Sequence, residues 1–146
     1  MAEKAQTGSD YRRLLVTRGI RPTRQRVLVL EALAGEPNDA TAQEIHARLR
    51  DAGHRVGLAT VYRTLSVLSQ SDVVDALMHR PDEACYRLCI AGHHHHLVCT
   101  GCHRVVELGD CDLEPWLAHL GAEQGFTVTA HTVEVAGLCG DCSGGR

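Results

Sequence analysis

The sequence HHHHLVCTGC occupies residues 93–102, and a second short sequence, CGDC, occupies residues 139–142. Each contains a Cys-x-x-Cys pair, and zinc prefers a tetrahedral set of such thiolates, alone or with imidazoles. Together they give Cys-x2-Cys-x36-Cys-x2-Cys, formed by Cys99, Cys102, Cys139 and Cys142. Four thiolates leave no open coordination position, so the pattern predicts a structural zinc site. It decides the C-terminal fold, because the ion would fasten the end of a strand-strand-helix-strand unit to its beginning.

The four consecutive histidines predict two separate half-sites. Neighbouring side chains of an extended strand point to opposite faces, so His93 and His95 would face one way and His94 and His96 the other. Each half-site needs further ligands. Donors before the tract would give a site that joins two domains, and donors after it a site inside one domain. The alternative is a solvated tract with adventitious affinity. The candidate donors are Asp72, Asp75, Cys85 and Cys89 before the tract, and Glu107, Asp110, Cys111, Asp112, Glu114, His119 and His131 after it.

Length and composition favour a small metal-stabilised protein. A chain of 146 residues suits one or two small domains, and a core with only 3% aromatic residues benefits from bound zinc. Seven cysteines without a signal-peptide pattern indicate metal ligands rather than disulfides. The apolar runs are shorter than the ~20 residues of a membrane helix. We therefore expect a cytoplasmic protein without a membrane partner.

Basic residues concentrate in the first part of the chain. Residues 1–88 hold 13 of the 15 Lys and Arg and 11 of the 18 Asp and Glu, a net charge of +2, and residues 89–146 carry −5. Six arginines and no acid lie between Arg12 and Arg26. This asymmetry suggests DNA as a partner of the first part. The alternative is an arginine-rich helix that is merely solvated.

Hydrophobic spacing predicts an α+β protein. Helices are expected at residues 10–17, 22–34, 41–52 and 57–71, followed by strands at 73–77 and 84–88 around a turn at 79–82. This is the layout of a winged helix-turn-helix. A hinge at residues 89–92 then leads to a small α/β unit at residues 93–146. In that unit we expect strands at 95–98, 104–108 and 126–135 and a helix at 112–123.

The helix at residues 57–71 is the candidate DNA-reading element. Leu58, Val61, Leu65 and Leu68 share its apolar face. A recognition helix reads base edges with its exposed side chains, and an arginine can contact a guanine bidentately. A partly buried packing role is the alternative for Tyr62. The candidate contacts are Thr60, Tyr62, Arg63 and Thr64 for bases, and Arg12, Arg13, Arg24 and Arg26 for phosphates.

Four motifs resemble the ferric uptake regulator superfamily and, within it, the actinobacterial branch of zinc uptake regulators. They are RPTRQR at 21–26, GLATVYRTL at 57–65, the block at 93–102 and the pair Cys139-x-x-Cys142. The resemblance implies a homodimeric repressor of operator DNA. Residues 1–88 would form its winged-helix DNA-binding domain, and residues 93–146 its metal-binding dimerisation domain.

The resemblance also implies two ligand sets beside the cysteine quartet, and two to three zinc ions per subunit. Cys85 and Cys111 match no ligand position and are interpreted as ordinary thiols. His103 stands where the family usually has glycine. The implied ligands are Asp75, Cys89, His94 and His96 for a regulatory hinge site, and His93, His95, Glu114 and His131 for a second site in the dimerisation domain.

The function expected from these observations is a zinc-responsive repressor that binds a palindromic operator and controls zinc uptake genes. A thiolate in the hinge site favours zinc, and an iron, nickel or peroxide sensor is the alternative within the superfamily. A zinc hydrolase would need an open metal position and a general base, and the sequence has no His-Glu-x-x-His motif. A zinc buffer or chaperone would not need the arginine-rich region. We therefore expect no enzymatic activity and no small-molecule substrate other than the metal ion.

Overall fold

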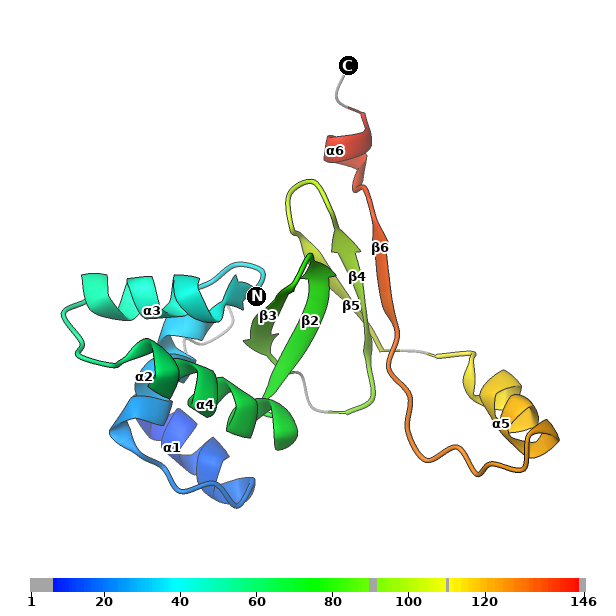
Figure 1. Cartoon of the computed structure of the whole chain (residues 1–146), viewed down its shortest axis with the longest axis horizontal. Coiled ribbons are helices and arrows are strands. Elements are labelled where there is room, and N and C mark those ends of the chain that lie inside the picture. Colours follow the sequence, from blue (N-terminus) through cyan, green and yellow to red (C-terminus); the bar gives the residue numbers. More distant parts are fainter. Residues whose placement is uncertain (1–6, 90–91, 110, 145–146) are drawn as a thin grey trace. The chain divides into compact units, whose positions relative to one another are not determined.

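The computed structural model describes residues 7–89, 92–109 and 111–144. The chain divides into two compact units, unit 1 (Met1–Cys89) and unit 2 (Ile90–Arg146). Within the described residues each unit combines helices with one three-stranded sheet, so the fold class is α+β, as predicted (Figure 1). The centre of the predicted hinge, Ile90 and Ala91, lies outside the described residues. No helix in the described part has the length and apolarity that crossing a membrane requires.

Four helices of unit 1 lie within two residues of their predicted bounds. Capping sets where they begin. The Thr23 hydroxyl accepts a hydrogen bond from the Arg26 N–H, so Thr23 caps the second helix, which begins at Arg24. Thr41 and Glu44 form a reciprocal capping box at the third helix. The helices are α1 (Gly8–Thr17), α2 (Arg24–Ala34), α3 (Ala42–Asp51) and α4 (Leu58–Gln70).

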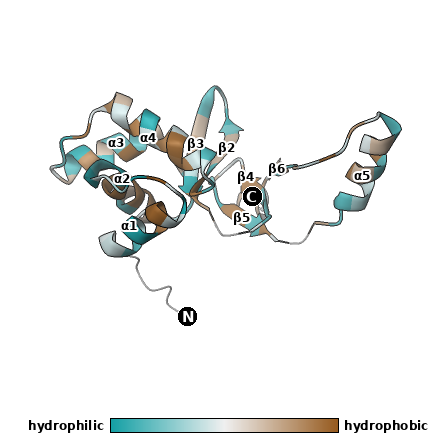
Figure 2. Ribbon diagram, turned by 90° about the horizontal axis from the view of Figure 1, so that it is seen from below, coloured by the Kyte–Doolittle hydropathy of each residue, from teal (hydrophilic) through white to brown (hydrophobic). Residues whose placement is uncertain are grey.

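One residue from each helix anchors the core of unit 1. Leu15, Leu30, Ile45 and Leu65 each have no exposed surface. Each such side chain contributes about 1.5–3 kcal/mol relative to an exposed one. Figure 2 shows apolar, brown segments interleaved with hydrophilic, teal ones along these helices, as expected when one face of each helix packs inward.

The sheet of unit 1 contains the predicted hairpin and one strand that was not predicted. The antiparallel hairpin joins β2 (Val74–Arg80) to β3 (Glu83–Leu88), and a bulge interrupts their register between Leu77 and Arg80. The strands run further into the predicted turn than expected. The missed strand, β1 (Ala40–Thr41), pairs with the other edge of β3 and gives the order β1-β3-β2. Two residues are too short to show a hydrophobic period.

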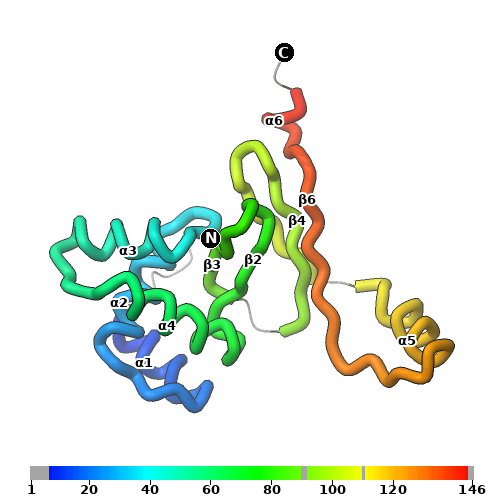
Figure 3. Tube along the Cα trace, in the orientation of Figure 1, coloured from blue at the N-terminus to red at the C-terminus, as the bar shows by residue number. Residues whose placement is uncertain are grey.

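Unit 2 is a three-stranded sheet with the order β5-β4-β6 and a separate helix, α5. The central strand pairs antiparallel with β5 and parallel with β6, with Cys99 opposite Gly137. Figure 3 traces the chain from α5 through β6 to the short α6. The elements are β4 (His95–Cys99), β5 (Val105–Leu108), α5 (Glu114–Glu123), β6 (Glu134–Gly137) and α6 (Gly140–Ser143).

The strand predicted at residues 126–135 is wrong over most of its length. Residues 126–133 belong to no helix or strand, and β6 covers Glu134–Gly137 instead. The alternating apolar residues that suggested a strand stay exposed, with Phe126 at 73% and Val128 at 41%. Strand pairing needs a partner, and β4 pairs with this segment only from His96 to Cys99.

The packing of α1 predicts opposite results for two adjacent substitutions. Leu15→Ala should lower the free energy of unfolding by about 2–5 kcal/mol, because it leaves a cavity in the core of unit 1. Val16→Ala, at a side chain that is 61% exposed, should change it by less than about 0.5 kcal/mol. Urea denaturation followed by circular dichroism measures both. Equal effects of the two variants would contradict this packing.

Candidate metal centres and DNA-binding helix

The four cysteines of the predicted structural site converge at one end of the sheet of unit 2. Their sulfur atoms all lie within 4.8 Å of one another, and Cys102 Sγ is 3.7 Å from Cys139 Sγ. Cys99 ends β4, and Cys139 precedes α6, so the parallel β4–β6 pairing carries both cysteine pairs to the same place. Four converging thiols fit a tetrahedral zinc ion with no open position.

Backbone N–H groups prepare this group for a cation. Hydrogen bonds from the backbone of Cys102 and Cys139 hold the pKa of the Cys99 thiol well below its usual range, which favours the thiolate that binds a metal ion. Hydrogen bonding to Cys139 raises the pKa of Cys142. His103, directly after this knuckle, has a φ of 61°, in the left-handed region that glycine favours. That conformation explains why the family usually has glycine here.

The four histidines divide between two faces, as strand alternation predicts. The rings of His93 and His95 have centroids 4.6 Å apart, and those of His94 and His96 have centroids 4.9 Å apart. His95 and His96 are both buried. β4 begins at His95, so the strand supplies one histidine to each pair, and His93 and His94 join from the segment just before it.

The first pair meets His131 and Cys111 in unit 2. The donor atoms of His93, His95, Cys111 and His131 all lie within 4.8 Å of one another. The Val133 N–H donates a hydrogen bond of 3.1 Å to His95 Nδ1 and so holds that ring in place. Burial and the rings of His93 and His131 lower the pKa of His95, which favours the neutral form that binds a metal ion.

Cys111 completes this group in the structure, and the ligand set with Glu114 stays a prediction. Cys111, interpreted from the sequence as an ordinary thiol, lies with its Sγ 3.2 Å from His131 Nε2. Glu114, the expected ligand, is the exposed first residue of α5 and does not join the group in the described part of the chain. Cys111 reaches His131 because it lies on the connection between β5 and α5, before the helix begins.

The second histidine pair has a carboxylate beside it. The donor atoms of His94, His96 and Glu107 lie within 4.8 Å of one another, and Glu107 pairs with His96 across β4 and β5. Glu107 was one of several open candidates in the sequence, and strand register brings it to this face. The group offers two imidazoles and one carboxylate from unit 2.

The other two residues of the predicted hinge site are neighbours within unit 1. Asp75 lies on β2, and the N–H of Cys89, just after β3, donates a 3.1 Å hydrogen bond to the carbonyl of Val73, just before β2. Burial and the Asp75 carboxylate raise the pKa of the Cys89 thiol to about 12. The thiol is therefore protonated at neutral pH until a metal ion displaces its proton.

Two of the four side chains predicted to contact bases lie on the exposed face of α4, and Thr64 does not. Tyr62 and Arg63 are exposed, and the Arg63 guanidinium donates to the Ala59 carbonyl and the Thr60 hydroxyl. Thr64 is only 6% exposed, so its burial argues against the predicted base contact. Ala59 and Ser66 occupy the face instead, at the helical spacing of Tyr62 and Arg63.

The four predicted phosphate-contacting arginines have different surroundings. Arg13 and Arg24 are exposed on α1 and α2. Arg26 is half-buried and donates to the Arg21 carbonyl at 2.7 Å, and Arg12 donates to the Pro22 carbonyl at 3.4 Å. These two bonds hold the segment between α1 and α2, so Arg13 and Arg24 are the better placed of the four for phosphates.

Known proteins of similar sequence and fold belong to one family of regulators. The sequence pattern of the ferric uptake regulator family matches residues 17–136. The chain is 43% identical over 124 residues to the zinc uptake regulation protein of Mycobacterium tuberculosis (strain ATCC 25618 / H37Rv), an alignment that covers 85% of this chain and 95% of that protein.

Two solved structures show the same fold. The Vibrio cholerae ferric uptake regulator is 31% identical with a TM-score of 0.64, covering 89% of this chain and all of that one. A zinc uptake regulator complexed with zinc and DNA superposes with a TM-score of 0.80 at 24% identity, over 98% of this chain and 97% of that one. The fold and its donor groups define a metal-binding, winged-helix transcription regulator. The chain belongs to the ferric uptake regulator family.

The donor group around His131 predicts unequal effects of two substitutions. Cys111→Ser should weaken metal binding at this group by about tenfold or more, because a thiolate donor is lost, whereas Glu114→Gln should leave it nearly unchanged. Competition with a zinc chelator, combined with the zinc content per subunit, measures both. Weakening by Glu114→Gln alone would show that the ligand set expected from the family holds instead.

Proposed function

We propose that the protein is a zinc-responsive transcriptional repressor that binds a palindromic operator as a zinc-loaded homodimer and controls zinc uptake genes. The observation that carries the proposal is the gathering of two histidine pairs and a four-thiolate group in one unit, joined in sequence to a winged helix. The 43% identical relative is itself a zinc uptake regulation protein. Two to three zinc ions per subunit would occupy these groups.

Donor chemistry supports zinc as the metal. Cys99, Cys102, Cys139 and Cys142 offer only thiolates, and Cys89 would add a thiolate to the regulatory site. Thiolates suit zinc better than ferrous iron, manganese or nickel, which are better served by nitrogen and oxygen donors. An iron sensor is the second candidate, because the chain is also 31% identical to a ferric uptake regulator. Binding to the operator under each metal separates the two.

The regulatory site would take ligands from both units. Asp75 and Cys89 belong to unit 1, and His94 and His96 belong to unit 2, so one zinc ion bound by all four would limit the movement of one unit relative to the other. Zinc must prefer the DNA-binding arrangement by about 5.5 kcal/mol to move its population from 1% to 99%. That is a modest part of the free energy of zinc binding seen in zinc-finger peptides.

The exposed apolar surface of unit 2 supports a second copy of the chain as a partner. Its large apolar side chains include Trp116 at 58% exposure and Phe126 at 73%. An apolar pocket of ≈ 220 Å³ lies on the sheet of this unit, lined by Leu97, Val106 and Leu138 among others. Surfaces of this kind mark protein interfaces. A two-fold dimer would present two α4 helices to the two halves of a palindrome, about 34–36 Å apart.

The same groups argue against catalysis. A four-thiolate site has no open position for substrate or water, and its role is structural. The histidine groups would be filled by a regulatory ion. We propose a non-enzymatic regulator that acts in the cytoplasm, where operator DNA is found.

Arg63 should contribute to operator affinity. Arg63→Ala should weaken binding by about 1–3 kcal/mol, roughly 5- to 150-fold, because the exposed face of α4 would lose its base-contacting guanidinium. Arg50→Ala, which removes the same charge from the exposed end of α3, is the matched control. Fluorescence anisotropy with an operator selected from random-sequence DNA by the zinc-loaded protein measures the affinities. Equal affinities of the two variants would remove α4 from the interface.

The regulatory site should control the zinc requirement of DNA binding. Cys89→Ser and Asp75→Asn should each raise the free zinc needed for half-maximal operator binding by about tenfold or more, because each removes one ligand. Both should keep the dimer and the four-thiolate zinc. Asp72→Asn changes an exposed carboxylate nearby and should behave like the wild type. An unchanged zinc requirement in Cys89→Ser and Asp75→Asn would refute this assignment.

A further inference from the structure

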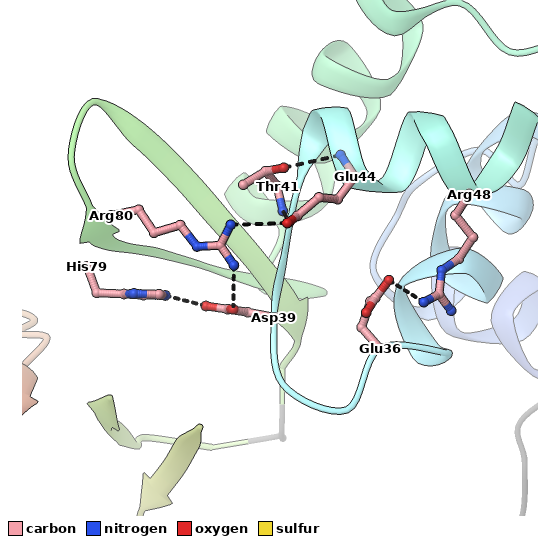
Figure 4. A network of polar contacts seen from close by, with 7 residues as sticks. All are labelled: Glu36, Asp39, Thr41, Glu44, Arg48, His79 and Arg80. Atoms are coloured by element: carbon pink, nitrogen blue, oxygen red, sulfur yellow. Dashed lines mark hydrogen bonds and ion pairs between the residues drawn. The ribbon is translucent and has the colours of Figure 1, made fainter. Parts of the chain in front are cut away.

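A fourth group of metal-ligating side chains lies inside unit 1, apart from the donors assigned above. The donor atoms of Asp39, His79 and Cys85 all lie within 4.8 Å of one another. The side chains of Asp39 and His79 are 0% and 1% exposed, and Cys85 is 0% exposed. All three belong to the winged helix, and neither the ligand sets implied by the family resemblance nor the proposed function uses them. Figure 4 shows Asp39 and His79 pointing toward each other beside Arg80.

Strand register brings the three side chains to one face of the β1-β3-β2 sheet. Cys85 on the central strand β3 lies opposite Thr41 of β1 and Leu77 of β2. Thr41, Leu77 and Cys85 therefore share a face, and Asp39 just before β1 and His79 in the bulge of β2 bring their donor atoms to Cys85. The bulge after Leu77 bends β2 at this point, and it leaves Met78 63% exposed while His79 is buried.

One buried oxygen atom of the group lacks a hydrogen bond within the described part of the chain. Asp39 Oδ2 lies 2.5 Å from His79 Nε2, but Asp39 Oδ1 has no hydrogen-bond partner among the described residues, although it is buried. The Arg80 guanidinium forms a long ion pair of 4.0 Å with Oδ1 and donates a hydrogen bond of 3.2 Å to Glu44. A buried carboxylate oxygen without a hydrogen bond costs free energy, and a metal ion is one group that satisfies it.

We propose that Asp39, His79 and Cys85 form a zinc site within the winged helix. One carboxylate, one imidazole and one thiolate are all zinc ligands, and zinc bound by three protein groups keeps a fourth position for water. On binding, the Cys85 thiol loses its proton to solvent and forms a zinc–sulfur bond. The charges then balance: the ion offsets the Asp39 carboxylate and the Cys85 thiolate, and Arg80 offsets Glu44.

The proposed ion would connect three strands. It would fasten the residue before the edge strand β1 to both strands of the β2–β3 hairpin, the wing of the winged helix. With three protein ligands and a thiol proton to displace, the site should bind zinc more weakly than the four-thiolate group. It should therefore fill last and empty first when zinc is withdrawn.

Zinc content measured on the full-length protein tests the proposal. At saturating zinc the wild type should hold one more ion per subunit than Cys85→Val and than His79→Gln, counted by mass spectrometry of metals after gel filtration in buffer that keeps the same free zinc concentration. Met78→Ala, at the exposed neighbour of His79, should keep the wild-type count. Equal counts in all four proteins would overturn the proposal.

A second measurement keeps Asp39, His79 and Cys85, so its result does not depend on how Cys85→Val and His79→Gln fold. In the double variant Cys89→Ser, Cys111→Ser, Cys85 is the one cysteine outside the quartet. Loaded with cadmium-113, this protein should give a resonance from a one-thiolate site besides that of the four-thiolate site. A spectrum with the four-thiolate resonance and no one-thiolate resonance would overturn the proposal, as would a one-thiolate resonance that zinc at saturation fails to displace.

Discussion

The alternation of side chains along one extended strand is the constraint on which the metal chemistry of this protein depends. Four adjacent histidines could not surround one ion from a strand, because neighbouring side chains leave it on opposite faces. His93 and His95 turn toward His131, and His94 and His96 turn toward Glu107. The start of β4, with the two residues before it, thus serves two donor groups at once. Only a few covalent bonds of the backbone therefore separate the ligands of one group from the ligands of the other.

The cysteine quartet holds that arrangement in register. Zinc bound by Cys99, Cys102, Cys139 and Cys142 would fix the end of β6 beside the end of β4, where Cys99 already lies opposite Gly137. The same pairing places the Val133 carbonyl to accept from the His96 N–H and the Val133 N–H to donate to His95. His131 precedes Val133 by two residues, so the same pairing brings its ring near that of His95. The structural ion therefore supports the histidine groups without contacting them.

Local features of the sequence predicted the helices and the cysteine quartet, because caps, apolar periods and Cys-x-x-Cys spacing act over a few residues. Features that depend on pairing between distant segments escaped. The strand β1 has no period of its own, and the apolar alternation after Phe126 has no partner strand along most of its length. The approach of Cys111 to His131, the burial of Thr64 and the meeting of Asp39, His79 and Cys85 depend on packing, register and a bulge. No spacing rule along the chain reveals them.

The central claim is that zinc bound to unit 2 and to the end of unit 1 controls the affinity of the winged helix for DNA. The most direct test is the affinity of the wild-type protein for its operator at buffered concentrations of free zinc, ferrous iron and nickel, with bound metal counted per subunit. The account predicts that affinity rises steeply with zinc and stays low with the other two metals at their ordinary cellular availability. An affinity that is the same in zinc and in chelator, or that rises with iron alone, would contradict it.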